Sequence, residues 1–477
     1  YDNLLTTMSP DTLPATAVLR KLDIRLNNIQ VVDRKLIMKS QSFNKFYPQK
    51  SAMSLKIEKD GENGVKWSQE LSILDLLYWF DATNDAKVEE AQSVDEYREF
   101  LKDKGYEGRD IMDILNHQVI HMDQAVTYCP EYLVTGKMRN YPSRTAQIIR
   151  AVYLGELEDS KENADLAFAP ILSGQGERWQ NFGEKPEGYL LSVILGREMF
   201  LKKGYHTQDA EALKEKVEKN DGHYLNCSKE EEEEWKKVLP LSKNSRTGLL
   251  LDEATFVYAA KEKEKLGAFL QKKNICVSEE IGPYFTGFDY LAAGLVEEGI
   301  KVVKDLIAEW EKQGFHQMIT LTGQSQYLFT EMLSYLDLQT DIEFISILDL
   351  ADDFRIQNDY VYGGSFYTRY AKKAVKLNQL SKAEKETPIL NCPEFLPQVE
   401  GEKRKNVVGI WTPPLCAEYE AVMTEPEFQK AIYERSLAEI KKTHFKKLVV
   451  CDPYAYHMLL ENGYGKENVA YYFSVMN

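Results

Sequence analysis

The chain has 477 residues, 43% hydrophobic and 28% charged, a composition typical of globular proteins with about two to four domains. Its formal net charge of −16 at pH 7 argues against nucleic acid or an anionic lipid surface as a partner, because both attract clustered Lys and Arg side chains. No run in the sequence approaches about eighteen uninterrupted apolar residues, so it predicts no membrane-spanning helix.

Residues 1–105 are predicted to be an N-terminal extension that contains a β-hairpin. Residues 54–58 and 65–67 alternate apolar and polar side chains, and the segment 60–64 between them is rich in turn-forming residues. The apolar segment 71–80 is expected to pack against the rest of the protein, and no family match is evident for this region.

Residues 106–240 are predicted to form a mostly helical domain. Apolar residues recur at intervals of three and four within residues 146–157, 188–203 and 208–219, which is the period of amphipathic helices. Ser228 precedes a run of glutamates and is expected to cap a further helix, because the helix dipole favours negative charge at its start. A linker is predicted after Pro240.

Strands and helices are expected to alternate from residue 246 onward. Short apolar strands are predicted at residues 248–251, 274–277, 318–321, 344–348, 407–410 and 447–450. Helices are predicted at residues 259–272 and 295–313. This alternation is typical of parallel sheets covered by helices. The predicted fold class is therefore α/β with an α-helical domain, and the sheets are assigned to two halves, residues 241–355 and 356–477.

The cysteines are scattered along the chain and include no Cys-x2-Cys pair. The six are Cys129, Cys227, Cys276, Cys392, Cys416 and Cys451. In a chain of this size they do not indicate a disulfide scaffold, so a reducing, cytoplasmic location is expected. Each thiol is expected to be a small buried group rather than a reactive one.

Two stretches in the helical region have the spacing of an iron–sulfur cluster loop, Cys-x2-Cys-x2-Cys-x3-Cys-Pro, but lack its thiols. Counted back from the prolines at 130 and 186, the eight cluster positions are Val119, Met122, Ala125, Cys129, Gln175, Arg178, Asn181 and Lys185. Only the fourth of these is a cysteine. Because a four-iron cluster needs about four thiolates, neither stretch is expected to hold one.

The second part of the chain holds two further stretches that share one interval. In the first copy, Phe285-Thr286-Gly287 is followed by Thr322 and Ser325, with thirty-five residues from Gly287 to Thr322. In the second copy the first three positions are Leu415, Cys416 and Ala417. Asp452 lies thirty-five residues after Ala417, and Ala455 is the last position. An opening position falls near Asp252 or Glu253 in the first copy and near Ser365 in the second.

In this order and spacing, the four stretches resemble the iron–sulfur subunits of the heterodisulfide reductase and glycolate oxidase family. That family has a helical ferredoxin domain followed by two domains named for a Cys-Cys-Gly motif. The segments 132–136 and 141–150 also resemble the chain that follows the first cluster loop in the family. The resemblance covers roughly residues 110–477 and implies a ferredoxin-like domain over 106–240 and Cys-Cys-Gly-like halves over 241–355 and 356–477. The alternative is an unrelated α/β protein in which the spacing is coincidental.

The resemblance implies a function through contacts rather than through clusters. In the family, electrons pass between clusters inside complexes with other iron–sulfur, flavoprotein, hydrogenase or cytochrome subunits. Here the clusters are expected to be absent. The chain is therefore expected to be a structural or assembly subunit of such a complex, not catalytic by itself, and associated with a membrane only through its partners.

A second hypothesis places a small molecule, as ligand or substrate, in the cleft that lost clusters would leave between the two halves. The polar residues Thr322, Ser325, Ser365 and Asp452 are the candidate ligands. The cleft would instead be closed if Phe285, Trp411 and Leu415 filled it, since a void is costly in stability.

Other constellations in the sequence are weaker. His117 and His121 lie four residues apart without an evident third metal ligand, and a structural role is favoured. Ser325, Ser365, Asp452 and His457 have the residue types of a hydrolytic triad, but the sequence does not place them together. Gly363-Gly364 is read as a turn, and no P-loop, dinucleotide fingerprint or zinc-ligand spacing is found.

Overall fold

The computed structural model describes residues 29–32, 35–38, 55–60, 64–68, 129–174, 187–357, 359–381, 414–441 and 445–477. The first four ranges are strands of one antiparallel sheet with the order β1-β2-β3-β4, namely Ile29–Val32, Lys35–Met38, Leu55–Asp60 and Gly64–Ser68. β3 and β4 pair from Lys56 and Ser68 to Asp60 and Gly64, so the predicted hairpin is confirmed. The segment 71–80 lies outside the described residues.

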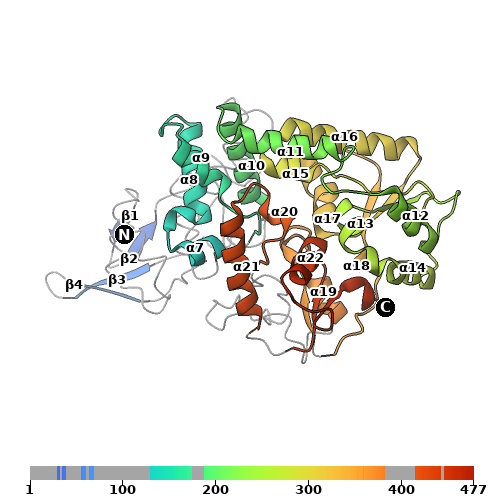
Figure 1. Ribbon diagram of the computed structural model, residues 1–477. Helices are drawn as coiled ribbons and strands as arrows, with labels where there is room; N and C mark the ends of the chain where they lie inside the picture. The colour runs from blue at the N-terminus through green and yellow to red at the C-terminus, as the bar shows by residue number, and fades with distance from the viewer. Residues whose placement is uncertain are drawn as a thin grey trace.

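A helical region follows, drawn from cyan to green in Figure 1. Its described α-helices are α7 (Pro130–Thr135), α8 (Pro142–Tyr153), α9 (Lys161–Phe168), α10 (Glu187–Lys202), α11 (Thr207–Lys219) and α12 (Lys229–Val238). The helices predicted at 188–203 and 208–219 are confirmed within one residue. α8 begins and ends four residues earlier than expected, because the chain leaves the helix at Leu154 and turns at Gly155 with φ +74°. Ser228 caps α12 as predicted, with its Oγ 3.2 Å from Glu231 N.

Two parallel three-stranded sheets occupy the rest of the chain, so the fold is mixed α/β. The first sheet has the order β5-β6-β7, with strands Thr247–Leu250, Gln317–Thr320 and Glu343–Ser346. The second has the order β8-β9-β10, with strands Tyr360–Tyr362, Leu448–Val450 and Val469–Tyr471. In both sheets the second strand in sequence lies in the centre. In both, the first crossover is long and the second is short.

The helices around the two sheets include α13 (Glu253–Tyr258), α14 (Lys263–Lys272), α15 (Phe288–Ala293), α16 (Val296–Lys312), α17 (Gly323–Thr330) and α18 (Ile347–Leu350) in the first part. The second part has α19 (Ala374–Ser381), α20 (Glu418–Ala421), α21 (Pro426–Lys441) and α22 (Pro453–Glu461). The helix predicted at 295–313 is α16, whereas the one predicted at 259–272 is interrupted before α14 by a 3-10 turn at Ala260–Glu262.

One predicted strand is wrong. Residues 274–277 contain no strand, because only Val277 forms a single bridge, to Leu241. Backbone hydrogen bonds from Ser242 N to Val277 O and from Val277 N to Pro240 O accompany this bridge, at 2.9 and 3.0 Å. The segment predicted as a linker is therefore bound to the first sheet-containing part. The strand predicted at 407–410 lies outside the described residues. β8 and β10 were not among the predicted strands.

The two sheets share a continuous hydrophobic core. Its buried members run from α10, through the central strands β6 and β9, to Met476 near the C-terminus. Strand side chains such as Ile319 and Val449 are almost completely buried, which accounts for the short, mostly apolar strands in the sequence. α16 buries Val303, Ile307 and Trp310 along one face. Because both sheets contribute to one core, neither can lose its packing without exposing side chains of the other.

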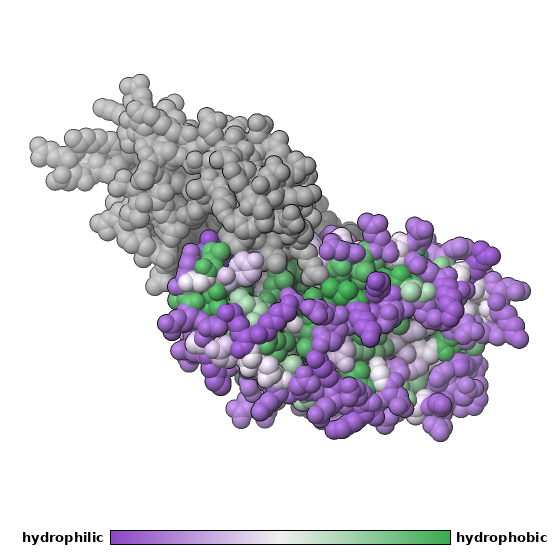
Figure 2. All heavy atoms as spheres, turned by 90° about the horizontal axis from the view of Figure 1, so that it is seen from above, coloured by the Kyte–Doolittle hydropathy of each residue, from purple (hydrophilic) through white to green (hydrophobic). Residues whose placement is uncertain are grey.

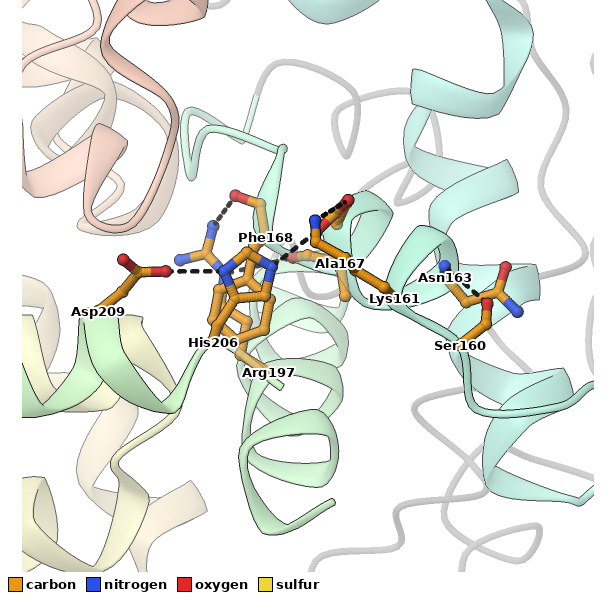
Figure 3. Close-up of polar contacts among 9 residues, drawn as sticks. Ser160, Lys161, Asn163, Ala167, Phe168, Arg197, His206 and Asp209 are labelled. Carbon is orange, nitrogen blue, oxygen red and sulfur yellow. Dashed lines mark hydrogen bonds and ion pairs between the residues drawn. The ribbon is translucent and has the colours of Figure 1, made fainter. Parts of the chain in front are cut away.

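Arg197 of α10 joins the helical region to both sheet-containing parts. Its fully buried guanidinium donates five hydrogen bonds of 2.6–3.3 Å to backbone carbonyl oxygens, those of Ala167, Phe168, Pro170, Ala292 and Val422. These carbonyls lie at or just beyond the C-terminal ends of α9, α15 and α20, where helix carbonyl groups lack intrahelical partners. Figure 3 shows the guanidinium beside the end of α9, near His206. Burial lowers the pKa of Arg197 to about 10, so the group stays charged at neutral pH.

His206 provides a second, more exposed connection between α9 and α11. Its ring nitrogens lie 2.9 Å from Asp209 Oδ2 and 3.0 Å from Asp165 Oδ1, and its ring stacks on Phe168 at 4.2 Å (Figure 3). Asp165 also pairs with Lys161 within α9, at 2.8 Å. These contacts fix the end of α9 that Arg197 binds.

The surface of the described region is largely polar. Figure 2 shows hydrophilic side chains over much of the visible face, with hydrophobic ones between them. The large hydrophobic side chains most exposed among the described residues are Tyr153, Leu154 and Leu157, at and beyond the end of α8. Among the described residues, none of the helices combines the length and hydropathy needed to cross a membrane.

Candidate functional site

Three strand-to-helix turns at the carboxyl ends of the sheets have the same construction. Asp252 follows β5 and caps α13, Thr322 follows β6 and caps α17, and Asp452 follows β9 and caps α22. In each case a side-chain oxygen accepts a hydrogen bond from the backbone N–H three residues later, at 3.0, 3.1 and 2.8 Å respectively. Polar residues at these positions are therefore explained locally, because they satisfy helix N–H groups that have no other partner.

The two sheets meet through these turns. α13 packs against α22, and α17 packs against η9, a short π-helix at Phe366–Tyr370 that follows β8. The labels of α13, α17 and α22 lie close together in Figure 1. A Cβ atom added to Gly323 would lie 2.2 Å from Tyr367 N, and one added to Gly364 would lie 3.2 Å from Asp452 Cβ. The carboxyl ends of the sheets, where α/β proteins commonly bind ligands, are thus pressed against each other.

The structure brings the first-copy positions together. Gln324 Nε2 donates to Thr286 Oγ1 at 3.2 Å, and Ser325 Oγ donates to Gln324 Oε1 at 3.3 Å. Thr322 Oγ1 donates to Ser325 Oγ at 3.0 Å, which completes a buried chain of neutral polar groups. Phe285 is buried next to this chain and packs edge-on against Tyr290, with ring centroids 5.1 Å apart.

The opening position of the first copy lies beside this chain. Asp252 forms a parallel bridge with Tyr284, and Glu253 N donates to Tyr284 O at 3.2 Å. Residues that are more than thirty positions apart in sequence therefore come together at the end of the first sheet.

The second-copy positions converge in part. Ser365 accepts a hydrogen bond from Arg369 Nη1 at 2.7 Å, and the adjacent Gly364 lies against Asp452. Leu415 N donates to the hydroxyl of Tyr362, the last residue of β8, at 2.9 Å. The Asp452 side chain accepts from Ala455 N.

Cys416 follows Leu415 directly in the chain. Its side chain is buried in a separate small hydrophobic cluster with Ile171, Ala421 and Ile432.

Of the eight ferredoxin-loop positions, the structure describes only Cys129. Its thiol donates to Glu131 Oε2 at 3.1 Å, and its sulfur accepts from Tyr132 N, so that it caps α7. Burial, with the neighbouring carboxyl, raises the pKa of the Cys129 thiol well above its usual value. Burial also raises the pKa of Glu131 to about 7. Cys129 is thus a buried structural thiol, while the other seven positions lie outside the described residues, as do His117 and His121.

Three buried carboxyl groups lie where the halves meet. Burial raises the pKa of Asp452 to about 7, and the nearby Glu420 and Asp252 carboxyls add to this effect. Burial raises the pKa of Glu420 and of Asp252 as well. Tyr419 donates its hydroxyl to Asp252 Oδ1 at 2.7 Å, and the Arg369 guanidinium opposes the rise in the pKa of Glu420. We call the turn from β6 to α17 around Thr322 the first junction, and the turn from β9 to α22 around Asp452 the second junction. Ionisable groups surround the second junction, whereas the hydrogen-bonded side chains of the first are neutral.

Aromatic side chains fill the space between the halves. Phe288 meets Phe366 edge-on at 5.1 Å, Phe366 meets Tyr419 at 6.3 Å, and Tyr419 meets Tyr454 at 4.7 Å. The four candidate cleft residues are packed within this region and are 9% exposed or less. Phe285 and Leu415 are buried, in line with the expected filling, whereas Trp411 lies outside the described residues.

The residues with the chemistry of a hydrolytic triad are engaged in other contacts. The His457 ring stacks on Tyr258, with centroids 4.0 Å apart. Ser325 is bonded to Thr322 and Gln324, and Ser365 to Arg369.

A cluster that the sequence analysis missed lies next to the first junction. His223 and Cys227, on the loop between α11 and α12, approach Glu253, the first residue of α13. One donor atom from each residue lies within 4.8 Å of the other two. Burial, followed by the Glu253 and Asp252 carboxylates, raises the pKa of the Cys227 thiol to about 12. The only signal in the sequence was the His-x3-Cys spacing, because the third residue comes from a distant strand end.

The chain matches no protein-family model and no solved structure. These comparisons therefore leave the resemblance to the heterodisulfide reductase subunits as an expectation from residue spacing.

Proposed function

We propose that this chain is a cluster-free subunit of the heterodisulfide reductase type, with a structural or assembly role in a larger electron-transfer complex. In this proposal residues 106–240 are a degenerate ferredoxin-like domain, and residues 241–355 and 356–477 are two Cys-Cys-Gly-like halves. The observation that carries it is the position of Phe285, Thr286, Thr322 and Ser325. These four positions are the ones that the spacing of the family's cysteines picks out, and they lie together at one strand end. Instead of thiols, they carry three hydrogen-bonded polar side chains and one buried apolar ring.

The residues present do not fit an iron–sulfur cluster at either junction. Such a cluster needs about four thiolates. In the first junction the donors are hydroxyl and amide groups already bonded to one another. In the described part of the second half the thiols are those of Cys416 and Cys451. The Cys416 side chain packs in a small hydrophobic cluster, and burial raises the pKa of the Cys451 thiol. No electron-transfer step is therefore assigned to this chain.

The packing supports a structural role. Polar groups cap helices, aromatic rings fill the junction, and Arg197 binds the helical region to both sheet-containing parts. This arrangement can hold the surfaces of the fold in place without a metal centre, because side chains cap the helix ends and fill the space between the two sheets. The proposed partners are iron–sulfur, flavoprotein, hydrogenase or cytochrome subunits in the cytoplasm, with any membrane contact made through them.

The alternative, a ligand in the space between the halves, is less well supported. Thr322 and Ser325 are completely buried, and Ser365 and Asp452 are nearly so. A ligand would need to displace aromatic side chains such as Phe366 and Tyr419, which already pack in this space. Ligand pockets are usually largely formed before binding.

The test is native mass spectrometry of the chain isolated anoxically from its own cells, with iron and acid-labile sulfide measured on the same sample. We expect a large assembly that contains this chain, with no iron or sulfide assigned to it. Stoichiometric iron and sulfide on the chain would contradict the proposal, and so would recovery as an isolated monomer or small homo-oligomer.

A further inference from the structure

Three side chains with metal-ligating atoms come together from two distant segments of the chain. His223 and Cys227 lie one after the other on the loop that joins α11 to α12. Glu253 begins α13, three residues after the end of β5, and its side chain is buried against that loop. The imidazole and thiol groups are only partly buried, so the cluster can be reached from solvent.

The geometry of the group suits a small cation better than it suits direct contacts. His223 Nδ1 lies 3.6 Å from Glu253 Oε2, which is too long for a hydrogen bond. Two ligands of a tetrahedral zinc ion with bonds of about 2.0 Å lie roughly 3.3 Å apart. His223 Nδ1 is buried and has no hydrogen-bond partner among the described residues. A buried nitrogen in this state is costly unless something else binds it.

The backbone of the same loop orients the carboxylate. Glu253 Oε2 accepts hydrogen bonds from Tyr224 N at 2.8 Å and from Leu225 N at 3.3 Å. Lys216 covers the Tyr224 ring, with its Nζ 3.3 Å from the ring centroid, and so helps to hold the loop. Hydrogen bonds to a ligating side chain orient the ligands of many metal sites.

The local charge also favours a cation. Within the described residues, the only basic group that forms an ion pair with Glu253 is His223. The Asp252 carboxyl next to it is engaged with Thr255 and Tyr419, neither of which carries positive charge. A buried carboxylate normally needs a counter-charge or a metal.

We propose that His223 Nδ1, Cys227 Sγ and a carboxylate oxygen of Glu253 bind one divalent cation of the zinc class. Imidazole, thiolate and carboxylate together are a usual zinc donor set, whereas calcium and magnesium prefer oxygen alone. Three protein ligands leave a fourth position for water or for a group from a partner. The ion would fasten the 220–227 loop to the end of β5.

This inference goes beyond the proposed function. Only Glu253 coincides with a position that the cysteine spacing suggested, and a single zinc ion contains no sulfide. An iron–sulfur cluster on the chain would contradict the proposed function without affecting the zinc site. Absence of zinc binding would remove the site without affecting the proposed function.

The test uses the full chain, purified without a histidine tag, stripped with a chelator and titrated with Zn²⁺ or Co²⁺. We expect one equivalent of metal per chain and a thiolate-to-cobalt charge-transfer band in the absorption spectrum. Cys227→Ser should abolish that band, and His223→Gln should weaken zinc binding at least about tenfold. The matched control is Cys276→Ser, which removes an exposed thiol and should leave both readouts unchanged.

Far-UV circular dichroism of the metal-free proteins shows whether each variant is folded. A wild-type chain that binds well below one equivalent of Zn²⁺ would overturn the inference. Equal cobalt spectra for the wild type and the folded Cys227→Ser variant would overturn it as well.

Discussion

The two junctions between strands and helices have the same framework and opposite chemistry. Thr322 and Asp452 follow the central strands of their sheets and cap the next helix in the same way. Around Thr322 the buried partners are the neutral side chains of Ser325, Gln324 and Thr286. Around Asp452 the groups near it are carboxyls, tyrosines and one arginine. The fold thus places a helix-capping polar side chain after each central strand. Whether that side chain can ionise depends on the residue type at the position, which is Thr322 in one case and Asp452 in the other.

This difference has a consequence for stability. A closed chain of neutral hydrogen bonds stabilises the fold at any pH. Buried carboxyl groups without enough positive charge are favoured only while they hold their protons. The first junction should therefore behave as a fixed structural contact, and the second as a contact that weakens as the pH rises.

The largest expected effect tests the close approach of the halves. Gly323→Ala places a methyl group 2.2 Å from the backbone nitrogen of Tyr367, and backbone cannot move aside as a flexible side chain can. We expect the free energy of unfolding to fall by about 3 kcal/mol, measured by chemical denaturation. The matched control is Gly282→Ala, whose added methyl group has only ordinary contacts at 3.9 Å and should change stability by less than about 1 kcal/mol.

Equal stability of the two glycine variants would show that α17 and η9 are not in contact in solution. In that case the junction would be open, and the hypothesis of a ligand between the halves would gain support.

The second prediction concerns Asp452. Its pKa is about 7 in the folded protein, whereas an aspartate in an unfolded chain has a pKa of about 3.9. Between these values the folded state keeps a proton that the unfolded state releases, so the free energy of unfolding falls as the pH rises through this window. Asp452→Asn removes this titration and keeps a side chain that caps α22. We expect the loss of stability from about pH 5 to pH 8 to shrink by about 1–3 kcal/mol.

Thermal and urea unfolding at the two pH values measure this change. Thr322→Ser is the control at the equivalent position, since it introduces no ionisable group and should leave the pH dependence as in the wild type. The groups that face Asp452 are Glu420, Asp252 and Tyr362, and they remain in both variants. An unchanged slope for Asp452→Asn would mean that this carboxyl is ionised in the folded protein.

The smallest effect is expected at the neutral junction. Thr322→Val removes the cap of α17 and the bond to Ser325 Oγ, and should lower stability by about 1 kcal/mol at both pH values. Thr330→Val, on the exposed end of the same helix, should cost less than about 0.5 kcal/mol. If the loss at Thr322 varied with pH, the two junctions would be coupled, and the contrast between them would need to be revised.

Local features of the fold were largely predictable. The strands β5, β6 and β9 were placed within one residue, because a short apolar run between helices has few other solutions. The cap at Ser228 and the hairpin at β3 and β4 follow from residues that are close in sequence. The run at 274–277 looked equally like a strand, but a strand also needs a neighbour, and only Val277 has one. β8 and β10 were not predicted, and each is defined by its pairing with β9.

The sequence by itself determined the caps, the apolar strands and the lack of a set of thiols, because each depends on residue type and near neighbours. Only the tertiary structure decided what those residues meet. The five carbonyls around Arg197 come from three helix ends, and Tyr419 reaches Asp252 from the other half of the fold. The meeting of His223 and Cys227 with Glu253 depends on how the α11–α12 loop packs on β5. Such contacts arise from chain packing over long sequence separations, and no local pattern encodes them.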